Sequence, residues 1–161
     1  MKIVNNKTNF VSPVIDSNQT LQLIKKTLLS NTPNEGYLTR KLENKISKLL
    51  NVKYVIATTS GTIGIFLALK SLKINKGDEV LVPNITFAAT INAVNLTGAK
   101  PVLVDIDKET LLFDLNKLKK KINKKTKAIL TVHISGRGSN ITELKKISKK
   151  YKLKLIEDAA E

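Results

Sequence analysis

Cysteine and tryptophan are both absent from this chain of 161 residues, and aromatic residues make up only 4% of it. Without cysteine there is neither a disulfide framework nor a thiolate metal site. No apolar run reaches the roughly 18 residues that a membrane-spanning helix needs. The N-terminal segment, MKIVNNKTNF, also lacks the continuous apolar stretch of a secretory signal peptide. We therefore expect a cytoplasmic protein that has no membrane partner.

Arginine is scarce too, although the chain is strongly basic. The formal net charge is +15, from 28 Lys and Arg against 13 Asp and Glu, and only Arg40 and Arg137 are arginines. Proteins that bind nucleic acid use arginine at bases and phosphates and stack bases on aromatic rings. Here the lysines gather on the expected solvent faces of two helices, at 117–121 and 145–150. This pattern favours a solvated basic surface, and we do not expect nucleic acid as the partner.

The pattern of apolar residues after position 53 predicts an α/β fold. Short apolar runs rich in β-branched residues alternate with helical patterns. The runs are apolar at consecutive positions, which is typical of a parallel sheet covered by helices on both faces. The expected strands are 54–57, 79–82, 101–105, 128–132 and 154–157, and the expected helices are 61–72, 87–97, 114–122 and 141–151. Asp114 can cap the third of these helices, and Asn140 with Glu143 forms a capping box for the fourth.

The part before the sheet predicts an arm and two helices. Residues 1–16 show no clear period and read as an extended arm. Ser17 can cap a helix that runs to about Leu29, and the sequence NTPNEG at 31–36 is typical of a loop. A second helix follows, because apolar residues recur at helical spacing at Leu38, Leu42, Ile46 and Leu49.

Polar or aromatic residues follow three of the expected strands. The sequence TTSGT at 58–62 opens a helix, whose free N–H groups and dipole suit a phosphate, although Ser and Thr also act there as ordinary caps. Phe87 follows the second strand and fits either the core or a ligand ring. Glu157 and Asp158 end the last strand, where they either cap a following helix or face a ligand cation.

These three signals together predict one ligand site. The carboxyl ends of parallel strands meet at one edge of a sheet, where ligands of open α/β folds bind. A ligand with a phosphate, a planar ring and a cationic ring nitrogen uses all three, and pyridoxal phosphate is such a ligand. His133 is the only histidine and has no Cys or second His with which to share a metal, so no metal site is expected. Asp105 and Asp107 are expected to be surface or turn residues.

Longer stretches of the chain resemble a known family. The segments are TTSGTIGIFLAL, KGDEVLVPNITFAATINAVNLTGAKPVLVDID, TKAILTVHISGRGSNITELKKISKKYKLKLIEDAAE and, more loosely, GYLTRKLENKIS. Their order and spacing are similar to those of the nucleotide-sugar aminotransferases, the perosamine-synthase-like branch of the pyridoxal-phosphate enzymes with the aspartate-aminotransferase fold. The resemblance covers residues 35–161. It implies a partial large domain of a fold-type I enzyme at 36–161, after an arm and first helix at 1–35, with the C-terminal small domain absent.

The resemblance also implies roles for single residues. In the family, a Ser-Gly-Thr segment holds the cofactor phosphate, and here it is Ser60, Gly61 and Thr62. An aromatic residue lies against the pyridine ring in the family, and the matching position is Phe87.

Two acidic residues complete the implied cofactor site. The family's aspartate that binds the pyridine nitrogen and keeps it protonated matches Asp158. Many members carry Gln three residues later, near the ring hydroxyl, and this chain has Glu161 there.

The family's Schiff-base lysine lies some tens of residues beyond that aspartate, and no lysine of this chain matches it. We therefore assign no catalytic residue, expect no transaminase activity from this chain alone, and interpret its abrupt end as a truncation. The implied reaction is amino transfer, from glutamate, onto a nucleotide-linked keto-sugar for amino-sugar or surface-polysaccharide biosynthesis, in an enzyme that is a homodimer when complete. Two alternatives stay open: a lyase or dehydratase fragment on the same fold, and a non-enzymatic basic binding domain.

Overall fold

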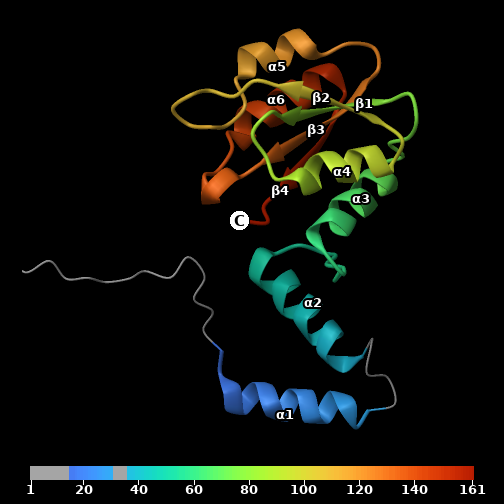
Figure 1. Cartoon of the computed structure of the whole chain (residues 1–161), viewed down its shortest axis with the longest axis vertical. Coiled ribbons are helices and arrows are strands. Elements are labelled where there is room, and N and C mark those ends of the chain that lie inside the picture. The colour runs from blue at the N-terminus through green and yellow to red at the C-terminus, as the bar shows by residue number, and fades with distance from the viewer. Residues whose placement is uncertain (1–14, 31–35) are drawn as a thin grey trace, which may run out of the picture. The chain divides into compact units, whose positions relative to one another are not determined.

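The computed structural model describes residues 15–30 and 36–161 (Figure 1). Most of the expected arm at 1–16 and of the expected loop at 31–36 lies outside the described residues. The chain divides into two units, Met1–Ala57 and Thr58–Glu161, and each is considered by itself. Within the described parts, no helix is both long enough and apolar enough to cross a membrane.

The first unit contains the two expected helices, α1 (Ser17–Leu28) and α2 (Tyr37–Leu50), and neither has a buried residue. The expected cap of α1 at Ser17 is wrong by one position, because Asp16 is the N-cap and its carboxylate accepts the backbone N–H of Gln19 at 3.0 Å. A carboxylate also interacts favourably with the positive end of the helix dipole, so it competes well with the neighbouring hydroxyl for this position.

The expected strand at 54–57 is wrong. This segment has no strand conformation, and the side chains of Tyr54 and Ile56 are exposed. A strand needs a hydrogen-bonded neighbour, and none of the described segments pairs with this one. The backbone N–H of Ala57 instead donates to Glu43 Oε1 of α2 at 2.8 Å. The apolar run was visible in the sequence, whereas the absence of a neighbouring strand was not.

The second unit contains the other expected strands in one parallel sheet of order β2-β1-β3-β4. The strands are β1 (Glu79–Pro83), β2 (Lys100–Val104), β3 (Thr126–Val132) and β4 (Lys154–Asp158). The helices are α3 (Gly61–Ser71), α4 (Ala88–Leu96), α5 (Leu115–Lys121) and α6 (Ile141–Tyr151), with a short 3-10 turn η1 (Ile134–Gly136) after β3. The expected parallel α/β architecture is therefore confirmed.

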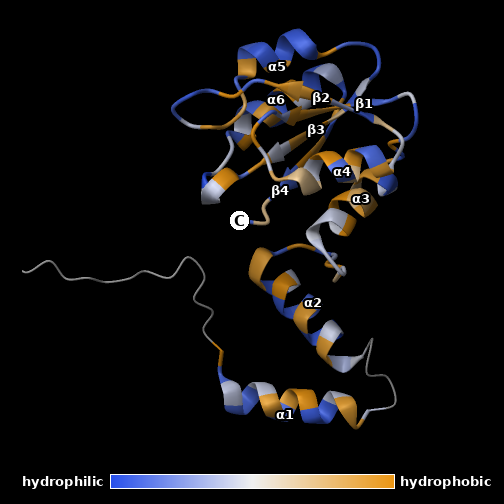
Figure 2. Ribbon diagram, viewed as in Figure 1, coloured by the Kyte–Doolittle hydropathy of each residue, from blue (hydrophilic) through white to orange (hydrophobic). Residues whose placement is uncertain are grey.

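Helices cover both faces of this sheet (Figure 1). Successive side chains of a strand point to opposite faces. Val80 and Val82 of β1 therefore pack in the cluster with α3 and α4, whereas Leu81 packs in the cluster with α5 and α6. Figure 2 shows the difference between the two layers: α3 and α4 are apolar along much of their length, and α5 is mainly hydrophilic.

The two expected helix caps in this unit are present. Asp114 accepts the N–H groups of Asn116 and Lys117 at 2.9 and 3.1 Å. Asn140 accepts the N–H of Glu143 at 3.2 Å. The reciprocal half of the expected capping box is replaced by an ion pair, because the Glu143 carboxylate lies 2.6 Å from Lys146 Nζ.

The order of the strands creates a switch point in the sheet. From β1 the chain passes through α4 to β2, and then through α5 past β1 to β3. The helices that follow β1 and β3 therefore lie on opposite faces, although the two strands are neighbours. Open parallel sheets bind their ligands outside the carboxyl ends of strands at such a point.

Replacing a central core residue tests this packing. Leu81 of β1 is fully buried, so Leu81→Ala leaves a cavity and should lower the free energy of unfolding by about 2–5 kcal/mol in urea denaturation. Leu103 on the neighbouring strand β2 is 50% exposed, so the matched change Leu103→Ala should cost about 1 kcal/mol or less. Equal losses for the two variants would contradict the described register of the sheet.

Candidate functional site

A cavity of about 290 Å³ lies at the carboxyl end of the sheet. Its walls come from the start of α3, the start of α4, and the segments at the ends of β3 and β4. The structure brings all the expected cofactor-binding residues together there: Ser60, Gly61, Thr62, Phe87, Asp158 and Glu161. Apolar side chains complete the lining, among them Ile65 and Val132.

The start of α3 forms one wall of the cavity. Ser60 is the N-cap of this helix, and its hydroxyl oxygen accepts the N–H of Ile63 at 3.3 Å, so the ordinary capping role applies. The N–H groups of Gly61 and Thr62 have no protein acceptor within the described parts of the chain. A Cβ atom at Gly61 would meet no atom within 4 Å, so packing does not require glycine there. The missing side chain instead leaves the backbone open to an anion at the positive end of the helix.

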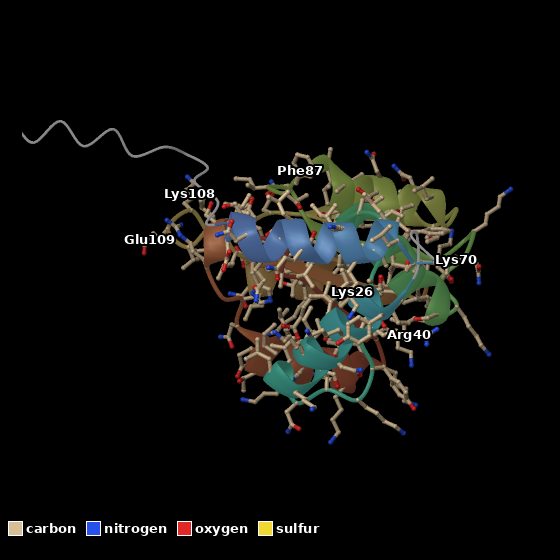
Figure 3. All side chains as sticks on the ribbon, turned by 90° about the horizontal axis from the view of Figure 1, so that it is seen from below. Lys26, Arg40, Lys70, Phe87, Lys108 and Glu109 are labelled. Atoms are coloured by element: carbon tan, nitrogen blue, oxygen red, sulfur yellow. The ribbon has the colours of Figure 1, made fainter. Side chains whose placement is uncertain are left out.

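Phe87 forms the second wall, and it is not a core residue. It is the N-cap residue of α4, and its side chain is 75% exposed (Figure 3). The interpretation of Phe87 as a core residue is therefore wrong for this structure. Leaving a phenyl ring in water forgoes about 1.5–3 kcal/mol of burial energy. A planar ligand in the cavity would recover part of that energy by covering the ring.

Asp158 is the last residue of β4 and lies opposite Val132 of β3 in the register. Its half-buried carboxylate accepts the hydroxyl of Thr90 at 2.9 Å on Oδ2 and the N–H of Ala160 at 3.3 Å on Oδ1. It makes no ion pair with any residue in the described ranges. A buried or half-buried carboxylate favours a cationic partner, so Asp158 is suited to a cation in the cavity.

Thr90 is a site residue that the sequence did not reveal. It lies inside α4 and is fully buried, and its contact to Asp158 joins positions 68 residues apart. A threonine within a helical pattern carries no signal of its own, because it is tolerated there at small cost. Only the packing of α4 against the end of β4 shows what its hydroxyl contacts.

His133 and Glu157 form a separate pair beside the cavity. His133 Nδ1 accepts the N–H of Ser139 at 2.9 Å, and Nε2 lies 3.1 Å from Glu157 Oε2. Because Nδ1 accepts, a neutral ring carries its proton on Nε2 and donates it to Glu157. The pair thus ties the end of β4 to the loop at 133–139, and this is a structural role for the histidine.

Glu161 lines the cavity, but its carboxylate also accepts the backbone N–H of Ser135. Ser135 has φ 50°, in the left-handed region. The carboxylate therefore supports a turn with unusual backbone conformation as well as facing the ligand side.

A larger hollow, of about 400 Å³, lies elsewhere, between the loop after β2 and the start of α6. Its carboxylates already have partners: Asp114 caps α5, and Asp107 accepts the N–H groups of Glu109 and Thr110. Hydrogen bonds from the backbone and hydroxyl of Thr110 hold the pKa of Asp107 below its ordinary value. Asp105 bonds to Lys117, which raises the pKa of that lysine. Asp105 and Asp107 are thus surface and turn residues, as expected. This hollow offers a ligand few free polar groups.

The residues of the smaller cavity fit one kind of ligand. The hydroxyls at the start of α3 and the N–H groups that lack an acceptor in the described chain suit a phosphate. The exposed phenyl ring suits a planar ring, and the carboxylate suits a cationic nitrogen. Among the described residues no cluster of His, Cys, Asp and Glu could hold a metal ion.

Comparisons with known proteins give a consistent picture. GDP-perosamine synthase of Escherichia coli O157:H7 is 39% identical over 128 residues, which is 80% of this chain and 35% of that protein. The 3-oxo-glucose-6-phosphate:glutamate aminotransferase of Bacillus subtilis (strain 168) is 42% identical over 126 residues, 78% of this chain and 29% of that protein. The crystal structure of NtdA from Bacillus subtilis with the bound cofactor pyridoxamine 5′-phosphate (PMP) superposes with a TM-score of 0.80 at 39% identity. The superposition covers 89% of this chain and 34% of that one.

The chain thus spans roughly a third of the length of the curated relatives it matches. The putative sugar aminotransferase Spr1654 from Streptococcus pneumoniae superposes with a TM-score of 0.88 at 27% identity, covering 92% of this chain and 41% of that one. Such solved aminotransferases confirm the fold-type I architecture that the resemblance implied. The matching family is described as the DegT/DnrJ/EryC1/StrS aminotransferase family, and the match runs over residues 14–161. With nearly its whole length matched, the chain belongs to this family of sugar aminotransferases.

Proposed function

We propose that this chain forms the cofactor-binding part of a pyridoxal-phosphate-dependent aminotransferase that acts on a nucleotide-linked keto-sugar. One observation carries the proposal: the start of a helix, an exposed phenyl ring and a carboxylate converge on one cavity, and within residues 15–30 and 36–161 that carboxylate has no cationic partner. Membership of the sugar aminotransferase family and the PMP bound in the NtdA structure support the choice of cofactor.

Each wall of the cavity has a proposed task. Ser60, Gly61 and Thr62 bind the phosphate through hydroxyls and N–H groups at the start of α3. Phe87 stacks on the pyridine ring, and Asp158 holds a proton on the ring nitrogen by its negative charge. When bound, pyridoxal phosphate supplies the electron sink for cleavage of the bond between Cα and hydrogen.

Glu161 is proposed to lie near the ring hydroxyl, from its place in the lining of the cavity. No lysine belongs to that lining within the described residues. We therefore propose that this chain binds the cofactor, and we assign no catalytic residue to it.

The reactions of two relatives support the proposed substrates. One relative is a GDP-perosamine synthase and another a glutamate aminotransferase of a keto-sugar phosphate. We propose glutamate as the amino donor and amino-sugar or surface-polysaccharide biosynthesis in the cytoplasm as the setting.

We further propose that residues 36–161 are part of the large domain and follow an arm and first helix at 1–35. The complete enzyme is proposed to be a homodimer without membrane or nucleic-acid partners.

Pyridoxamine 5′-phosphate tests the phosphate site, because it binds without a covalent bond to lysine. Thr62→Val removes the hydroxyl and nearly conserves the shape, so it should weaken binding of this ligand about tenfold, in line with a lost hydrogen bond to a charged group. Pyridoxamine, which lacks the phosphate, serves as the control and should bind both proteins equally. The measurement is a fluorescence titration. An equal loss for both ligands would show that the start of α3 does not hold the phosphate.

Asp158→Asn tests the ring-nitrogen contact. The change keeps the shape and removes the charge, so it should weaken pyridoxamine 5′-phosphate about tenfold, while the free energy of unfolding stays within about 1 kcal/mol of the parent. The ¹⁵N chemical shift of the labelled ring nitrogen should move from the protonated toward the unprotonated value. If the bound ring stays protonated in the variant, Asp158 is not its partner.

A further inference from the structure

The hydroxyl of Thr90 in α4 contacts the carboxylate of Asp158, and the hydroxyl of Thr86, just before α4, contacts Thr90. Thr90 is fully buried, and its Oγ1 lies 2.9 Å from Asp158 Oδ2. Thr86 precedes it by four residues, and the two hydroxyl oxygens lie 2.7 Å apart. These distances are at the normal length for O–H···O hydrogen bonds. Three side chains thus form a continuous chain of hydrogen bonds that ends at the cavity.

The chemistry of the groups sets the direction of this chain. An ionised carboxylate only accepts, so the single proton of the Thr90 hydroxyl goes to Asp158. The Thr90 oxygen is then left to accept, and Thr86 donates to it. The competing acceptor for the Thr86 proton is the carbonyl of Phe87, at the longer distance of 3.4 Å. The order is therefore Thr86 to Thr90 to Asp158, and successive donors of this kind polarise and strengthen one another.

Packing alone does not explain a threonine at this position. The neighbouring buried residues of α4, Ala93 and Val94, belong to the apolar cluster between this helix and the sheet. Valine has nearly the same shape as threonine and carries no hydroxyl to desolvate. The hydroxyl of Thr90 has its one described acceptor in Asp158.

We propose that Thr90, supported by Thr86, is a positioning residue that fixes the Asp158 carboxylate in one orientation. Thr90 holds Oδ2, and the N–H of Ala160 holds Oδ1 more loosely, at 3.3 Å. The carboxylate lines the cavity and keeps lone pairs that these two donors do not use. A cationic ring nitrogen is the proposed partner of these lone pairs. The inference deepens the proposed function and rests on it for the identity of that partner.

The first test needs no cofactor and uses the full chain. Three-bond couplings measured by NMR report the χ1 angle of Asp158. The parent protein should show one rotamer, Thr90→Val should show averaging, and Thr90→Ser should restore the single rotamer because it keeps the hydroxyl. Thr97→Val is the matched control, since Thr97 is a buried threonine at the other end of α4 whose hydroxyl bonds to Val94.

The second test uses pyridoxamine 5′-phosphate labelled with ¹⁵N in the ring. Thr90→Val should weaken its binding about three- to tenfold and move the ring ¹⁵N signal toward the unprotonated value, as expected when a charge-assisted hydrogen bond no longer orients the carboxylate. Thr90→Ser and Thr97→Val should retain the parent affinity and signal. A loss of stability by itself leaves the ¹⁵N signal of the bound ligand unchanged, so this readout separates positioning from folding.

The outcomes separate the two proposals. If Thr90→Val keeps one Asp158 rotamer and parent affinity, the positioning role is overturned even though the cofactor binds. If the parent chain does not bind the ligand, the proposed cofactor function fails, while the rotamer comparison still decides the role of Thr90. Should Thr90→Val fail to fold, the deciding variant is Thr86→Val, because Thr86 is the half-buried first member of the chain of hydrogen bonds. A smaller shift of the ring ¹⁵N signal in the same direction supports the positioning role of Thr90, and no shift overturns it.

Discussion

The pairing of β1 with β3 is the interaction on which the rest of this unit depends. Both strands are buried on both faces, and Val80 and Leu81 of β1 contribute to opposite clusters. Each cluster holds two helices against the sheet, so the burial energy of all four helices converges on these central strands. The pairing also sets the switch point, because it places side by side the carboxyl ends of two strands whose following helices lie on opposite faces of the sheet. The cavity follows from that topology.

The cavity combines local and distant contributions. The start of α3 depends on adjacent residues, since the Ser60 side chain and backbone accept the N–H groups of Ile63 and Gly64. The position of the Asp158 carboxylate at the end of β4 depends on its hydrogen bond to Thr90 of α4, which lies 68 residues earlier in the chain. The first part is set by helix-capping geometry and the second by tertiary packing. One ligand that contacts both would therefore report on the integrity of the whole unit.

The sequence predicted the features that arise from local patterns. The four paired strands, the helices and the caps at Asp114 and Asn140 follow from apolar periodicity and from side chains that bond their own backbone. The absence of a strand at 54–57 was not predictable, because pairing depends on a neighbour elsewhere in the chain. The exposure of Phe87 could not be decided from its residue type, because the usual burial of phenylalanine says nothing about one position. Thr90 and His133 contact residues that lie 68 and 24 positions away in the sequence, so no local pattern predicts these contacts.

Asp158 belongs to the sheet and to the cavity at once. Its backbone carbonyl accepts the N–H of His133 at 3.0 Å, in continuation of the ladder between β3 and β4, while its side chain faces the cavity. In the described sheet β4 pairs on one side only, and edge strands are the first to open locally. Opening of this strand end would therefore displace a carboxylate that lines the cavity. A ligand that bound only the closed end would stabilise that end by mass action, and its apparent affinity would fall in proportion to the fraction of molecules in which the end is open.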